Sequence, residues 1–161
     1  MANIADDITE LVGNTPLLRL HKFEKEAGFE GKILAKLEVF NPTGSVKDRI
    51  AKNMIEQAER DGRLKPGGTI IEATSGNTGI GLAAIAAAKG YQAIIVMPDS
   101  MSKERIRILE AYGAKVVLTP GEKNMGGANE KAAEILEQTE NAIITGPVSY
   151  THLRAHETDS Y

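Results

Sequence analysis

One lysine of this chain lies where a positive charge is disfavoured. Residues 41–49, NPTGSVKDR, carry Ser45 and Asp48 at the spacing of a capping box, so a helix is predicted to begin at Ser45. Lys47 then falls in the first helical turn, where the positive end of the helix dipole opposes a charged amine. A neutral amine is the form that attacks a carbonyl to give a Schiff base. The alternative is a surface lysine that tolerates this position, and local physics leaves both interpretations open.

A second loop, residues 74–79 with the sequence TSGNTG, brings together hydroxyls, glycines and an amide. It ends a predicted strand and opens a predicted helix, so its exposed backbone N–H groups suit an anion such as a carboxylate or phosphate. Hydroxyls come from Thr74, Ser75 and Thr78, and Asn77 adds an uncharged side-chain donor. The loop is therefore interpreted as an anion site.

The glycines of this region also suggest a dinucleotide-binding turn. Gly76, Gly79 and Gly81, with Asp99 after the next strand, loosely imitate the fingerprint of such a turn. Their spacing is G-x-x-G-x-G, however, where the fingerprint requires G-x-G-x-x-G. The loop also carries hydroxyls and an amide that a pyrophosphate turn does not need, so the sequence favours the anion site.

Alternating strands and helices are predicted around both loops. Short apolar runs predict strands at residues 33–37, 69–73, 93–97, 115–118 and 142–145. Helical periodicity predicts helices at residues 46–58, from the glycine loop to a stop at Gly90, at 102–112 and at 125–139. This order predicts an α/β fold, with a three-layer, mostly parallel sheet and helices on both faces. Ligands bind such sheets beyond the carboxyl ends of the strands, where both loops are expected.

Charge and composition narrow the possible function classes. The balance of 19 basic and 22 acidic residues gives a net charge of −3, which argues against a nucleic-acid or anionic-membrane binder. The absence of cysteine excludes disulfides and thiolate metal sites. The start lacks the features of a signal peptide, and the longest apolar stretch, residues 80–88, is too short to span a bilayer. We therefore expect a soluble, cytoplasmic protein with no nucleic-acid or membrane partner.

Several segments, taken in order, resemble one known family. They are residues 8–18, the lysine loop at 41–49, the glycine loop at 74–79, residues 97–105, and residues 112–114 with 118–121. Together they resemble the cysteine synthases, or O-acetylserine sulfhydrylases, within the tryptophan-synthase-β type of pyridoxal-phosphate enzymes. The resemblance runs from about Ile8 to about Ile144 and implies the corresponding fold.

The resemblance implies a role for each loop. Lys47 would hold pyridoxal 5′-phosphate as a Schiff base and transfer the proton at the substrate Cα, and Asn77 would hydrogen-bond the 3′ oxygen of the cofactor. The residues implied to contact the amino-acid substrate, chiefly its carboxylate, are Thr74, Ser75, Gly76, Asn77 and Thr78. The implied reaction is β-replacement, in which O-acetyl-L-serine and sulfide give L-cysteine and acetate, with the cofactor as the electron sink.

The resemblance also divides the chain. Family members are longer, so this chain is expected to lack a second glycine-rich loop for the cofactor phosphate, a serine at the pyridine nitrogen and much of the dimer interface. Residues 1–40 would belong with the absent large domain, and residues 41–147 would form the small α/β domain. Residues 148–161 resemble one reading frame of a transposase sequencing adapter and are expected to be an assembly artefact. In that tail, His152, His156 and Glu157 are interpreted as a chance grouping, and no metal site is expected.

Two alternatives accompany the cysteine synthase interpretation. Cystathionine β-synthase shares both loops, although the lack of a heme or regulatory segment favours the bacterial type of cysteine synthase. A catalytically inactive fragment, at most a module that binds a carboxylate, is the alternative from another class, and loss of the phosphate cradle is expected to impair activity. The family also forms homodimers, and a serine acetyltransferase tail docks in its active site.

Overall fold

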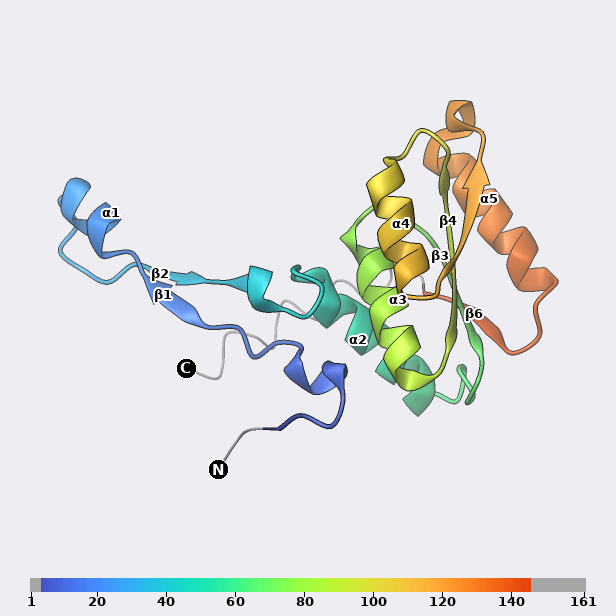
Figure 1. The fold of residues 1–161 in the computed structure, drawn as a ribbon, viewed down its shortest axis with the longest axis horizontal. Helices are drawn as coiled ribbons and strands as arrows, with labels where there is room; N and C mark the ends of the chain where they lie inside the picture. Colours follow the sequence, from blue (N-terminus) through green and yellow to red (C-terminus); the bar gives the residue numbers. More distant parts are fainter. Residues whose placement is uncertain (1–3, 146–161) are drawn as a thin grey trace.

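The computed structural model describes residues 4–145, which form a body and a projecting arm (Figure 1). The body contains a four-stranded parallel sheet in the order β5-β4-β3-β6. Its strands are β3 (Thr69–Ala73), β4 (Gln92–Pro98), β5 (Lys115–Thr119) and β6 (Ala142–Ile144). Each strand falls within one residue of its predicted ends, because an almost unbroken apolar run is what a parallel strand covered on both faces requires.

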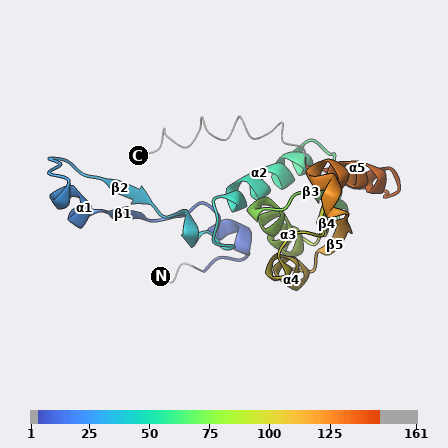
Figure 2. The same cartoon turned by 90° about the horizontal axis from the view of Figure 1, so that it is seen from above.

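Helices cover both faces of this sheet (Figure 2). One face carries α2 (Lys47–Arg60), α3 (Asn77–Lys89) and α4 (Lys103–Ala111), and the other carries α5 (Asn124–Glu137). Adjacent residues of β3 point to opposite faces of the sheet: Ile70 packs with α2, α3 and α4, and Ile71 packs with α5. The predicted three-layer α/β fold is confirmed.

The helix ends follow local signals. Gly90 closes α3 in the left-handed region at φ 76°, as the sequence predicts for a glycine at that position. Gly113 follows α4 at φ 80° and serves the same purpose. A short 3-10 turn, η3 (Gly121–Lys123), leads into α5. None of the described helices is long and apolar enough to cross a membrane.

The N-terminal elements of the chain form the arm and its base, where η1 (Ile8–Leu11) contacts α3. These are η1, β1 (Leu17–Arg19), α1 (His21–Glu26), β2 (Leu34–Lys36) and η2 (Glu38–Phe40). The strand predicted at residues 33–37 does form, as β2, but it pairs antiparallel with β1 in a separate two-stranded sheet. The lysine loop is therefore preceded by η2 and is not a direct continuation of a strand of the parallel sheet.

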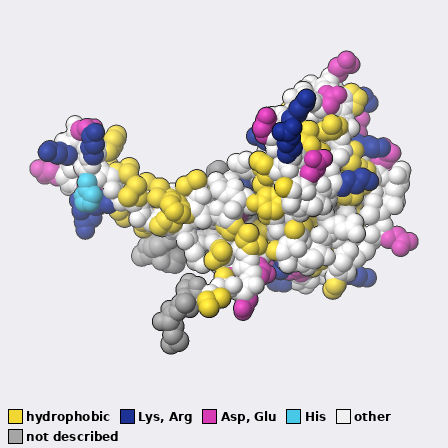
Figure 3. All heavy atoms as spheres, in the orientation of Figure 1, with side chains coloured by type: hydrophobic (Ala, Val, Ile, Leu, Met, Phe, Trp, Pro, Cys, Tyr) yellow, Lys and Arg dark blue, Asp and Glu magenta, His cyan; other side chains and the backbone are white. Residues whose placement is uncertain are grey.

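Large apolar side chains are exposed along the arm (Figure 3). Between residues 17 and 40, those at least 45% exposed are Leu17, Leu18, Phe23, Phe29, Leu34, Val39 and Phe40. A surface of this kind is unusual on a protein that exists alone in water and marks a region that packs against something else.

The histidine pair predicted to be a chance grouping lies outside the described residues.

Candidate active site

The lysine loop is held by a buried carboxylate. Asp48 is 1% exposed and accepts hydrogen bonds from the backbone N–H of Thr43, at 2.7 Å, and from the Thr43 hydroxyl. This geometry corrects the predicted capping box, because Asp48 turns back to Thr43 and α2 begins at Lys47, two residues after the expected Ser45. Ser45 still contributes to the first turn, since its Oγ accepts the backbone N–H of Lys47 at 3.2 Å.

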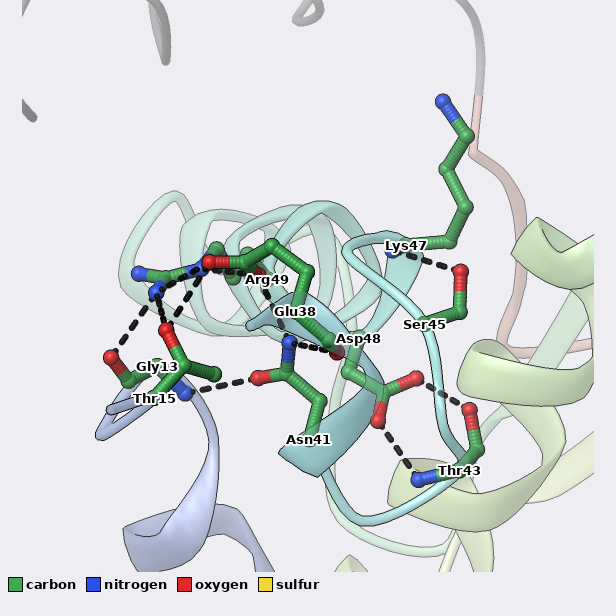
Figure 4. Close-up of polar contacts among 9 residues, drawn as sticks. All are labelled: Gly13, Thr15, Glu38, Asn41, Thr43, Ser45, Lys47, Asp48 and Arg49. Carbon is green, nitrogen blue, oxygen red and sulfur yellow. Dashed lines mark hydrogen bonds and ion pairs between the residues drawn. The ribbon is translucent and has the colours of Figure 1, made fainter. Parts of the chain in front are cut away.

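Lys47 is the first residue of α2, as the sequence placed it within the first turn. Its side chain extends away from the polar contacts that surround Arg49 (Figure 4). Within the described part of the chain, Lys47 Nζ makes no hydrogen bond and no ion pair. With neither a hydrogen bond nor an ion pair in that part of the chain, the amine is sterically available to approach a carbonyl.

The glycine loop joins β3 to α3, as predicted. Gly76 is the residue before the helix, and α3 begins at Asn77. Thr78 is buried, Thr74 and Ser75 are half-buried, and Asn77 is exposed. The Thr74 hydroxyl accepts the N–H of Gly76 at 3.3 Å, which turns the loop at the carboxyl end of the strand.

Arg105 and Gly79 hold this loop from outside it. Arg105, in α4, donates a hydrogen bond to the carbonyl oxygen of Ser75. A Cβ on Gly79 would lie 2.8 Å from Thr74 Cγ2 and 3.3 Å from Ile95 Cγ2, so only glycine lets α3 start so close to the strands. Both contacts stabilise the loop conformation that exposes the N–H groups at the start of α3.

The structure brings the lysine loop and the glycine loop together. Asn77 Nδ2 donates to Ser45 Oγ at 3.3 Å, so one hydrogen bond crosses from one loop to the other. One turn later, a Cβ on Gly81 would lie 3.1 Å from Ala51 Cβ and 3.3 Å from the Lys47 carbonyl oxygen. Helix α3 therefore packs closely against the first turns of α2, which sets the lysine beside the glycine loop.

A cluster at the base of the arm escaped sequence reasoning. We name it the Arg49 cluster; its members are Gly13, Thr15, Glu38, Asn41 and Arg49 (Figure 4). The Arg49 guanidinium donates to both carboxylate oxygens of Glu38, at 2.8 and 2.9 Å, and to the carbonyl oxygen of Gly13 at 2.8 Å. Hydrogen bonds from Arg49 lower the pKa of Glu38 from 4.5 to about 2. The cluster fastens the N-terminal segment to α2, two residues beyond Lys47.

A second buried carboxyl lies just before the glycine loop. Glu72 in β3 is 8% exposed, and its Oε2 accepts the hydroxyl of Thr145 at 2.5 Å. Burial raises the pKa of Glu72 from 4.5 to about 7, and the hydrogen bond from Thr145 partly opposes that rise. Glu72 is the one charged residue in the apolar run TIIEA, so the sequence marks it as unusual. No local pattern predicts its hydrogen-bond partner, Thr145, which is 73 residues away.

The described residues fit one end of the cofactor that the sequence resemblance implies. Pyridoxal phosphate offers an aldehyde and a ring oxygen, which match an unpaired primary amine, Lys47, and a neutral amide donor, Asn77. The exposed N–H groups at the start of α3 match a substrate carboxylate. The set of donors thus suits this chemistry.

Known sequences give matches over most of the chain. Residues 8–158 match the family described as "Pyridoxal-phosphate dependent enzyme". A cysteine synthase of Staphylococcus aureus (strain N315) is 54% identical over 133 residues, which are 83% of this chain and 42% of that protein. The cystathionine beta-synthase of Mus musculus is 60% identical over 117 residues, which are 73% of this chain and 21% of that protein. This chain spans less than half the length of these curated relatives.

Solved structures agree with the sequence matches. A cysteine synthase from Entamoeba histolytica superposes with a TM-score of 0.82 at 45% identity, covering 89% of this chain and 43% of that one.

The family match reaches residue 158, beyond the boundary predicted at residue 147. Residues 146–161 lie outside the described part, so the origin of the tail stays a prediction.

Proposed function

Because this chain belongs to the pyridoxal-phosphate dependent enzymes, we propose that it is part of a cysteine synthase. The whole enzyme would exchange the acetoxy group of O-acetyl-L-serine for sulfide and release L-cysteine and acetate. The observation that carries this proposal is the hydrogen bond between Asn77 and Ser45, which joins the two loops beside an unpaired Lys47. The cysteine synthase relatives support the choice of reaction.

Lys47 has two tasks in this proposal. Its amine would hold the cofactor covalently and then move the proton at the substrate Cα, which requires the uncharged form. Lys47 is the first residue of α2, beside the glycine loop that the Asn77–Ser45 hydrogen bond holds in place. When bound, the cofactor supplies an electron sink for the charge that develops at Cα. Asn77 would donate a hydrogen bond to the ring oxygen of the cofactor.

The glycine loop would bind the carboxylate of the substrate. The residues proposed for this contact are Thr74, Ser75, Gly76, Asn77 and Thr78. The backbone N–H groups at the start of α3 and the positive end of its dipole favour a negative ligand there. The contact of Arg105 with Ser75 fixes the loop, so the binding groups are ordered before the substrate arrives.

A cystathionine β-synthase type of enzyme is the second candidate. The relative from Mus musculus is the more identical of the two over the aligned residues, at 60% against 54%. Both enzymes would use Lys47 and the glycine loop in the same way, so these residues do not separate them. Assays of the whole protein with sulfide and with homocysteine as nucleophiles distinguish the two. A fragment that only binds a carboxylate is the remaining alternative.

The proposed division of the chain follows its two sheets. Residues 1–40 would pack on a large domain that relatives encode beyond this chain, and the exposed apolar side chains of the arm support that role. Residues 41–147 would form the small domain, and residues 148–161 a separate tail. We further propose that the whole enzyme is a cytoplasmic homodimer whose active site accepts a serine acetyltransferase tail.

Reductive trapping tests the proposed cofactor site. The purified chain is incubated with pyridoxal phosphate, reduced with borohydride, and digested to map the modified lysine. We expect stoichiometric labelling of Lys47, and loss of that labelling in Lys47→Arg, which keeps the charge but cannot form the bond. Lys103→Arg, on the exposed surface of α4, is the matched control and keeps the labelling. Labelling scattered over many lysines contradicts the proposal.

A further inference from the structure

The Ser45 hydroxyl is shared by both loops of the site. Its Oγ accepts the backbone N–H of Lys47 at 3.2 Å and the side-chain amide of Asn77 at 3.3 Å. A serine oxygen has two acceptor positions, so these two bonds use both of them. The residue that orders the first turn of the lysine helix therefore also holds the amide on the opposite loop.

Counting donors shows what this leaves available at Asn77. The side-chain amide carries two N–H groups, and Ser45 takes one of them. The Asn77 side chain makes no other hydrogen bond within residues 4–145. The second N–H thus remains available for a ligand oxygen, while the first fixes the plane of the amide. Without Ser45, this exposed side chain loses the contact that selects its rotamer.

The helices themselves do not depend on this hydroxyl. Helix α3 is held against α2 by the close contact of Gly81 with Ala51 and by a core that includes Ile55 and Leu82. Asp48 separately fixes the loop through Thr43. Removing the Ser45 oxygen therefore changes the orientation of a donor and leaves the packing in place.

We propose that Ser45 is a positioning residue that aligns the Asn77 amide with Lys47 for cofactor binding. It acts through two neighbours, since its oxygen is occupied by Lys47 and Asn77. The inference rests on the proposed function, because it assigns the remaining Asn77 N–H to an oxygen of pyridoxal phosphate. Loss of one such hydrogen bond is expected to weaken cofactor binding about fivefold to tenfold.

The first test uses the protein without cofactor. In Ser45→Ala, the side-chain amide resonances of Asn77 are expected to shift, and the backbone N–H of Lys47 to exchange faster with deuterium. Ser45→Thr keeps a hydroxyl and restores both signals. Ser102→Ala is the matched control, because Ser102 precedes α4 without a side-chain cap bond. Unchanged Asn77 resonances in Ser45→Ala overturn the proposal.

The second test measures cofactor affinity by titrating pyridoxal phosphate and trapping the Lys47 adduct with borohydride. Ser45→Ala is expected to need about fivefold to tenfold more cofactor for half-labelling, with the same unfolding midpoint as the parent. Equal half-labelling concentrations overturn the role of Ser45 while leaving the proposed function intact. Absence of specific Lys47 labelling in the parent chain overturns the proposed function itself, and this inference with it.

Discussion

Two carboxyl groups of this protein, Glu38 at the base of the arm and Glu72 in the parallel sheet, have opposite protonation preferences. Glu38 receives hydrogen bonds from Arg49, Asn41 and Thr15, and its pKa falls to about 2. Glu72 receives one, from the Thr145 hydroxyl, and burial raises its pKa to about 7. Hydrogen bonds from a cation and two neutral donors keep Glu38 ionised, whereas burial, with a single neutral donor against it, favours the protonated form of Glu72.

The contrast also separates two ways of fastening the chain near the site. The Arg49 cluster joins segments that are 36 residues apart in the sequence, from Gly13 to Arg49, through a charged pair. Glu72 joins β3 to the end of β6 through a carboxyl that is largely neutral below about pH 7. The Arg49 cluster depends on an ionised carboxylate and the Glu72 contact on a neutral carboxyl, so a rise in pH should affect their contributions to stability in opposite directions.

The largest effect is expected from Arg49→Leu. The substitution leaves the Glu38 carboxylate without its cation, in a site where the two side chains are only 15% and 23% exposed. Unpairing a mostly buried charge costs about 3 kcal/mol, so the free energy of unfolding, measured with urea, should fall by about that amount. Arg63→Leu is the control, because its pair with Asp61 is 52% and 40% exposed and is worth less than about 1 kcal/mol. Equal losses of unfolding free energy in both variants would show that the pair of Arg49 with Glu38 contributes no more than an exposed ion pair.

The second effect concerns Glu72→Gln. The folded pKa of Glu72, about 7, lies above the ordinary 4.5, so the folded state holds its proton longer than the unfolded state does. The contribution of Glu72 to the stability of the parent protein should therefore be complete below about pH 4.5 and should fall by roughly 2 kcal/mol as the pH rises towards 8. Glu72→Gln keeps the shape without that proton, and its unfolding free energy should lack this decline. Parallel pH profiles for parent and variant would show that Glu72 titrates normally.

Glu38 is expected to show the reverse slope with a smaller amplitude. Its folded pKa lies below the ordinary 4.5, so its stabilising contribution is present above about pH 4.5 and is lost as the pH falls towards 2. Because solvent still reaches this pair, we expect roughly 1.5 kcal/mol. Urea unfolding of the parent and Glu38→Gln between pH 2.5 and 6, chosen to bracket that window, should show a larger acid loss in the parent than in the variant. A loss of the same size in Glu38→Gln would assign it to other carboxyls.

The sequence predicts the parts of this molecule that depend on local patterns. The bounds of β3 and the glycine stop of α3 follow from apolar runs and one φ requirement. The capping box was wrong because Asp48 has a choice of partners, and its bond to Thr43 depends on how the loop turns. The six-residue α1 has too few positions to show a period. The Arg49 cluster and the Glu72–Thr145 bond join distant segments, which no local spacing encodes.

Thr119 extends the comparison to a polar group with no donor or acceptor beside it. Its Oγ1 is buried at the end of β5 and has no hydrogen-bond partner in the part of the chain that the structure describes. Glu38 thus has several partners, Glu72 has one, and this hydroxyl has none. A buried polar atom without a partner costs free energy that an isosteric methyl group does not. Thr119→Val should therefore stabilise the fold by about 1 kcal/mol, measured by urea unfolding.

Thr145→Val is the matched control for Thr119→Val, because both replace a buried threonine at the end of an edge strand. Thr145 donates to Glu72, so this variant removes the hydrogen bond that opposes the raised pKa of that carboxyl. At pH 8 it should be destabilised by about 1 kcal/mol, while Thr119→Val gains a similar amount. Changes of the same sign in both variants would mean that side-chain volume, not hydrogen bonding, controls these positions.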